Sequence, residues 1–62
     1  MFRIKFNTWD FEGSKKVKVV KELVGDIITD SPGQIRFRPL NETHYYVINK
    51  SKIVSLETIK NA

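Results

Sequence analysis

The chain has 62 residues, of which 40% are hydrophobic and 29% charged, and it contains no cysteine. This length fits one small domain over residues 1–62 and excludes a second, because domains seldom have fewer than about 50 residues. The lack of cysteine excludes disulfides and thiolate metal sites, and 11 Lys and Arg against 7 Asp and Glu give a formal net charge of +4.

The sequence predicts neither a membrane span nor an export signal. No apolar run approaches the about 20 residues that a transmembrane helix needs. The first residues, 1–6, lack the apolar segment and the small-residue cleavage site of a signal peptide. Together with the absence of cysteine, these features favour a cytoplasmic protein that does not contact a membrane.

The first predicted strand covers residues 2–8. Phe2, Ile4 and Phe6 alternate with basic residues, and a period of two is typical of a strand with one buried face. A loop over residues 10–14 follows, in which Gly13 supplies a positive φ.

The second predicted strand, residues 16–24, changes phase along its length. Val17 and Val19 lie on one face, whereas Val20 lies on the other, and Gly25 follows the strand directly. Small barrels place glycines or bulges where one strand bends to serve two sheets. We therefore expect a bent strand here.

Four further strands are predicted, over residues 26–30, 34–38, 44–49 and 52–57. Pro32 and Gly33 suit a type II turn that pairs the first two of them, and Pro39 ends the second because it cannot donate to a ladder. Asn49–Ser51 is interpreted as a tight reversal, and the β-branched residues after it favour a strand or a 3₁₀ turn over a helix. The prediction is an all-β fold with little or no helix, a small antiparallel SH3-like barrel of five to six strands.

The segment 48–56, Ile-Asn-Lys-Ser-Lys-Ile-Val-Ser-Leu, resembles the second sequence motif of Sm-like proteins. That motif runs aliphatic, Arg, Gly, two free positions, two aliphatics, one free position, aliphatic. Its aliphatic places are taken here by Ile48, Ile53, Val54 and Leu56. Asn49 and Lys50 stand where the family has Arg and Gly, and residues 24–28 are similar to its glycine-bearing second strand. The resemblance covers the C-terminal two-thirds of the chain and implies a ring-forming RNA or DNA binder.

The alternation also predicts where the positive charge lies. Apolar side chains are expected to point inward from Phe2, Ile4, Phe6, Val17, Val19, Ile35 and Phe37. Basic side chains then point outward from Arg3, Lys5, Lys16, Lys18, Arg36 and Arg38. One face with six cations favours nucleic-acid binding, because neutralised phosphates release their counterions. The competing interpretation is a solvated face whose lysines keep strand edges from pairing with other chains.

Aromatic and turn residues extend this candidate site. Tyr45 and Tyr46 are adjacent, so in a strand one of them faces outward, and we take Tyr46 as the ring that stacks on a base. Trp9 is instead expected in the core or at its rim. Near the tight reversal the candidates are Asn49, Lys50 and Lys52. The alternative for these turn residues is that Asn and Ser serve turn geometry.

Catalysis is not predicted. His44 is the single histidine, and nucleophilic catalysis needs three converging groups that the chain does not offer in any recognisable pattern. The carboxylates show no metal-ligand spacing, and Gly13, Gly25 and Gly33 are isolated turn residues rather than a phosphate loop. We therefore expect no enzymatic activity, no cofactor and no metal.

Two hypotheses follow from the sequence. The first is a non-enzymatic, weakly sequence-selective binder of DNA or RNA whose affinity falls steeply with salt. The second is a protein-interaction module, an adaptor or a small inhibitor of the kind that phages and plasmids encode, which docks on the acidic surface of a partner protein. A homo-oligomer is a further option for the assembly.

Overall fold

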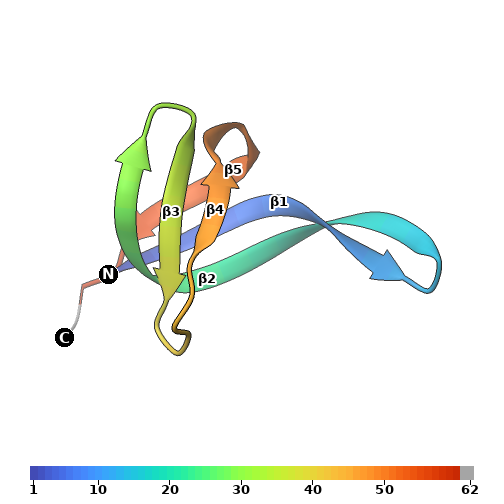
Figure 1. Ribbon diagram of the computed structural model, residues 1–62, viewed down its shortest axis with the longest axis horizontal. Coiled ribbons are helices and arrows are strands. Elements are labelled where there is room, and N and C mark those ends of the chain that lie inside the picture. Colours follow the sequence, from blue (N-terminus) through green and yellow to red (C-terminus); the bar gives the residue numbers. More distant parts are fainter. Residues whose placement is uncertain (61–62) are drawn as a thin grey trace.

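The computed structural model describes residues 1–60, and over these residues the chain forms five strands and one 3₁₀ helix (Figure 1). The elements are β1 (Phe2–Glu12), β2 (Lys15–Ser31), β3 (Gln34–Pro39), β4 (Tyr46–Asn49), η1 (Lys50–Lys52) and β5 (Ile53–Thr58). The strands form one antiparallel sheet in the order β4-β3-β2-β1-β5. The predicted all-β class with almost no helix is confirmed.

Strands β1 and β2 form a long hairpin. Their ladder runs without interruption from Phe2 opposite Gly25 to Glu12 opposite Lys15. Gly13, with a φ of 66°, closes the turn, and a residue without a Cβ adopts this conformation at little cost. The loop predicted over residues 10–14 is therefore only a tight turn, because β1 continues four residues beyond the predicted end at residue 8.

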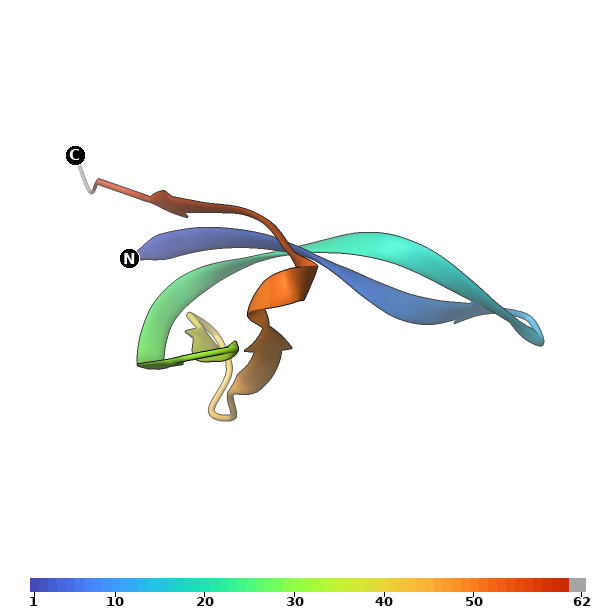
Figure 2. The same ribbon diagram turned by 90° about the horizontal axis from the view of Figure 1, so that it is seen from above.

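Strand β2 replaces two predicted strands, 16–24 and 26–30, with one bent strand. Its pairing with β1 ends at Gly25, where its pairing with β3 begins. Beyond this point β2 curls, and β3 and β4 come to lie in a second layer beneath β1 and β5 (Figure 2). A Cβ on Gly25 would lie 2.1 Å from the carbonyl oxygen of Arg38 and 2.8 Å from the Cα of Pro39. Only glycine lets the two backbones approach this closely.

The bend brings the inner sides of the two layers together around one core. The buried hydrophobic core consists of Ile4, Phe6, Ile35, Phe37 and Ile48, and Pro39 at the end of β3 is buried as well. Four of the seven residues predicted to point inward are among them, and Phe2 packs against this cluster while half-buried. The other two, Val17 and Val19, are half-buried on β2.

The turn predicted at Asn49–Ser51 forms the 3₁₀ helix η1, which carries the chain from one edge of the sheet to the other. Its first backbone N–H, that of Lys50, donates to the carbonyl of Gly33 at 3.0 Å. Within residues 1–60, β4 and β5 are not paired with each other, so the sheet is open. The structure contains the predicted antiparallel sheet of five strands, but this sheet is not closed into a barrel.

Residues 7–20 of the hairpin project beyond the core, and we call them the arm (Figures 1 and 2). The pairing of β1 with β5 ends at Phe6, and the pairing of β2 with β3 begins only at Gly25. Among residues 1–60, the two strands of the arm therefore have only each other as ladder partners, and the arm extends past the second layer (Figure 2).

We expect Gly25→Ala to lower the free energy of unfolding by at least about 2 kcal/mol, because the added methyl group meets backbone that cannot move aside without opening the β2–β3 ladder. Gly13→Asn is the control, since that position has open space and asparagine tolerates a positive φ. Urea unfolding followed by circular dichroism compares the two variants. Equal stabilities would contradict the steric role of Gly25.

Candidate nucleic-acid interface

One face of the arm combines aromatic and basic side chains. Residues directly opposite each other in an antiparallel pair share a face, and Trp9 lies opposite Lys18 while Phe11 lies opposite Lys16. This face is the continuation of the side of β1 that points away from the core. We call it the arm outer face; its members are Asn7, Trp9, Phe11, Lys16, Lys18 and Val20.

The aromatic rings of this face are open to solvent. The side chains of Trp9 and Phe11 are 51% and 72% exposed. The Nζ atom of Lys16 lies 4.9 Å from the centroid of the Trp9 ring, a cation–π contact worth about 0.5–1 kcal/mol at an exposed site. The prediction that Trp9 belongs to the core or its rim is therefore wrong. Continuing the alternation of β1 past residue 8 would have placed Trp9 and Phe11 on the same face as the cations.

The cations of the arm outer face have no carboxylate partner among the described residues. None of the ion pairs found in residues 1–60 includes Lys16 or Lys18. The two acidic residues of the arm, Asp10 and Glu12, lie opposite Val17 and Lys15 on its other face. The arm outer face therefore presents uncompensated positive charge beside exposed aromatic rings.

A groove extends this surface toward η1. Its volume is about 240 Å³, and it is lined on the arm side by Asn7 and Trp9 and on the η1 side by Asn49 and Lys52. Lys52 forms no ion pair within the described chain. Lys50, in contrast, holds Asp30 at 2.6 Å. Of the predicted turn residues, Asn49 and Lys52 thus meet the arm, whereas Lys50 is engaged elsewhere.

Arg3 and Lys5 lie on the same side of β1 as the arm outer face, but near carboxylates. Arg3 lies 3.8 Å from both Glu22 and Glu57, and Lys5 lies 3.7 Å from Glu22. Exposed pairs of this kind stabilise a fold by about 0–1 kcal/mol. Their main effect is electrostatic, because the two carboxylates reduce the positive potential around Arg3 and Lys5.

Arg36 and Arg38 lie on β3, away from the arm. Arg36 sits opposite Val47 of β4, and Arg38 lies opposite Asp26 of β2. Both side chains are exposed, and β3 belongs to the second layer (Figure 2). The outer sides of two layers that share one core point away from each other. The structure therefore separates this pair of arginines from the other four predicted cations instead of joining all six on one face.

Tyr46 is not the outward tyrosine. It lies opposite Phe37, is half-buried, and donates a hydrogen bond from its hydroxyl to Glu42 at 3.4 Å. The outward ring is that of Tyr45, which is 49% exposed and has the Arg36 guanidinium 5.6 Å from its centroid. The choice of Tyr46 as an outward stacking residue is thus corrected, because the register with β3 turns Tyr46 inward.

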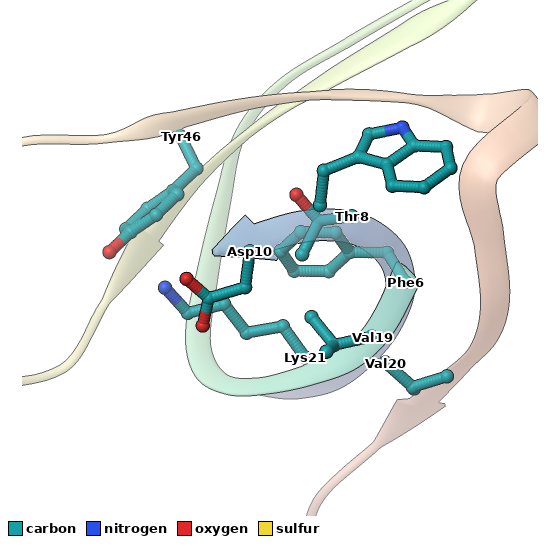
Figure 3. A pocket seen from close by; sticks show the side chains of 8 residues that line it. Phe6, Thr8, Asp10, Val19, Val20, Lys21 and Tyr46 are labelled. Carbon is teal, nitrogen blue, oxygen red and sulfur yellow. The ribbon is translucent and has the colours of Figure 1, made fainter. Parts of the chain in front are cut away.

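Tyr46 instead borders a second groove, of about 430 Å³, beneath the arm. Figure 3 shows Thr8, Asp10 and Lys21 around this groove, with Tyr46 across from them. The Nζ atom of Lys21 lies 5.1 Å from the centroid of the Tyr46 ring. This contact joins the base of the arm to β4 and holds the arm relative to the core.

Other chemistry finds little support in the part of the chain that is described. Residues 1–60 contain no group of three or more His, Asp or Glu placed to hold a metal ion. His44 lies 3.3 Å from Glu42 at an exposed position. Among these residues there is also no helix with the length and apolar character needed to cross a membrane.

Comparison with protein-family models, with curated proteins and with solved structures finds no match to this chain. The resemblance to Sm-like proteins therefore stays a prediction.

Removing the carboxylate shared by Arg3 and Lys5 is expected to strengthen binding to a polyanion. Glu22→Gln raises the net charge from +4 to +5 and should change the free energy of unfolding by less than about 1 kcal/mol. Asp26→Asn makes the same charge change at a carboxylate that lies 3.6 Å from the Met1 ammonium group and is not paired with Arg3 or Lys5. We expect Glu22→Gln to elute from immobilised heparin at higher salt than Asp26→Asn, and identical elution would show that net charge alone controls binding.

Proposed function

We propose that this protein is a non-enzymatic nucleic-acid-binding protein that contacts DNA or RNA through the arm outer face. The observation that carries the proposal is that Lys16 and Lys18 form no ion pair with a carboxylate of residues 1–60 and flank the exposed ring of Trp9. Cations beside exposed aromatic rings suit a ligand that combines phosphates with flat bases.

Phosphate contacts supply most of the proposed affinity. Each phosphate that a lysine neutralises releases condensed counterions, so binding weakens as salt rises. Arg3 and Lys5 continue the same side of β1 and add a weaker attraction because Glu22 and Glu57 lie beside them. Contacts to phosphates and to base faces carry little sequence information, so the proposed binding is weakly sequence-selective.

We also propose that the open sheet is an SH3-like barrel in topology. The strand order β4-β3-β2-β1-β5, with a 3₁₀ turn between the two edge strands and one core between the layers, supports this assignment. A chain without cysteine suits the reducing cytoplasm, where we propose that it acts.

A second candidate function is a protein-interaction module. It is favoured by the two sheet edges, since β4 and β5 have no partner on their outer sides within residues 1–60 and the side chains of Val54 and Leu56 on β5 are exposed. An extended segment of a partner protein with an acidic surface could add a strand at the outer edge of β5, separated from Arg3 of β1 by β5 itself.

Salt dependence tests the first proposal. We expect Lys16→Ala/Lys18→Ala to weaken binding of a fluorescent oligonucleotide about tenfold at low salt, and to reduce the slope of log K against log salt by about 1.4, because each single-strand phosphate contact contributes about 0.7. Arg36→Ala/Arg38→Ala removes the same charge from β3 and should keep the wild-type slope. Fluorescence polarisation at several salt concentrations measures both.

The outcomes separate the function from its assigned surface. No binding of wild-type protein to DNA or RNA at low salt would refute the proposed function. Equal losses in the two double variants would leave nucleic-acid binding in place but remove the arm as its site.

The second candidate predicts a different result. A protein partner should remain bound after nuclease treatment of a lysate, and Leu56→Pro should release it because proline disrupts strand addition at the β5 edge. Retention of that partner by Leu56→Pro, with the fold intact by circular dichroism, would contradict docking at β5.

A further inference from the structure

The spacing of the aromatic rings on the arm distinguishes single strands from duplexes. Trp9 and Phe11 are two residues apart on one face of β1, which separates their backbone positions by roughly 6.6–6.8 Å. This is about twice the roughly 3.4 Å between successive bases of one strand in a duplex. Two such rings offer their faces to bases that are spread apart, or enclose one base between them.

A duplex cannot use these rings in that way. Its base faces are covered by neighbouring pairs, and only base edges and phosphates are accessible in the grooves. An exposed Trp9 and an exposed Phe11 therefore add affinity only for bases that are unpaired and free to stack. Lysines alone would attract either form.

The cations lie in a row parallel to the aromatic rings. Trp9 and Phe11 belong to β1, whereas Lys18 and Lys16 lie directly opposite them on β2, and neighbouring strands are about 4.7–4.9 Å apart. A single strand lying along the arm thus meets rings from β1 and lysines from β2, and the ammonium group of Lys16 reaches across to the Trp9 ring. This arrangement matches the two chemical sides of a single strand, with its bases on one side and its phosphates on the other.

The groove beside Trp9 extends this path toward the core. Asn7, Asn49 and Lys52 line it together with Trp9. Amides donate to and accept from base edges, and Lys52 provides a further phosphate contact. The positively charged side of the path therefore continues from the arm to η1.

We propose that the ligand of the arm outer face is single-stranded nucleic acid, with bases stacked on Trp9 and Phe11 and with phosphates held by Lys16, Lys18 and Lys52. This inference rests on the proposed function and narrows it to a class of ligand. Trp9 and Phe11 remain 51% and 72% exposed, with the Lys16 ammonium group over the Trp9 ring, and the charge of the lysines is complementary to the phosphates.

Fluorescence provides a local test, because Trp9 is the only tryptophan of the chain. We expect a short oligothymidylate to quench the Trp9 emission by stacking. A duplex of the same length and inorganic polyphosphate should bind more weakly and leave the emission nearly unchanged. Quenching by polyphosphate equal to that by oligothymidylate would show that charge alone, without stacking, perturbs Trp9.

Variants test the role of the rings directly. Phe11→Ala should lower the affinity for oligothymidylate at least about fivefold, and its circular dichroism should match the wild type because Phe11 packs on no part of the core. Tyr45→Ala removes an exposed ring from the second layer and serves as the matched control, with unchanged affinity expected.

The outcomes distinguish this inference from the function on which it rests. Equal affinity for single strands and duplexes, together with no loss in Phe11→Ala, would overturn the single-strand assignment and leave nucleic-acid binding standing. Absence of any binding to single strands and duplexes at low salt would refute both proposals.

Discussion

The close approach of β2 and β3 at Gly25 is the constraint on which the rest of the structure depends. The backbone of Gly25 lies so near Arg38 and Pro39 that a side chain has no room. At the same residue β2 exchanges β1 for β3 as its ladder partner. The resulting bend turns one continuous sheet into two layers, so that Ile4 of β1 and Phe37 of β3 become fully buried in one core.

The same bend leaves the arm without a second layer. An isolated two-stranded hairpin is marginally stable in water, and the arm is supported because its ladder continues into the core and because Lys21 contacts the ring of Tyr46. The aromatic rings of Trp9 and Phe11 lie on the side of β1 that points away from the core, so the second layer does not bury them and they stay at least half exposed. Exposed apolar patches bordered by charge commonly mark binding surfaces, and this patch follows from the topology of the sheet.

The positive potential around each cation depends on the carboxylates that lie near it. Arg3 and Lys5 share one side of β1 with Trp9, yet the carboxylates of Glu22 and Glu57 lie within 4 Å of them. The net charge of +4 is therefore a poor guide to where a polyanion would bind. The cations of the arm outer face stand out because the acidic residues of the arm fall on its opposite face.

Alternation, together with the Pro and Gly residues, predicted the all-β class, the antiparallel turn between β2 and β3, the burial of Ile4 and Phe37, and the bend beside Gly25, because these are local consequences of sidedness and steric freedom. The full lengths of β1 and β2 were not predicted, because they depend on the pairing of the two strands with each other. Only the tertiary structure decided that the outward side chains of β1 and those of β3 point in different directions. Alternation shows which side chains of one strand share a side, but it does not relate the sides of two layers. It also decided that Tyr45 and not Tyr46 faces solvent, because the choice depends on the register of β4 against β3. The exposure of Trp9 required both, since alternation continued to residue 9 places it on the side opposite Phe6, and the tertiary structure shows that this side of β1 faces solvent.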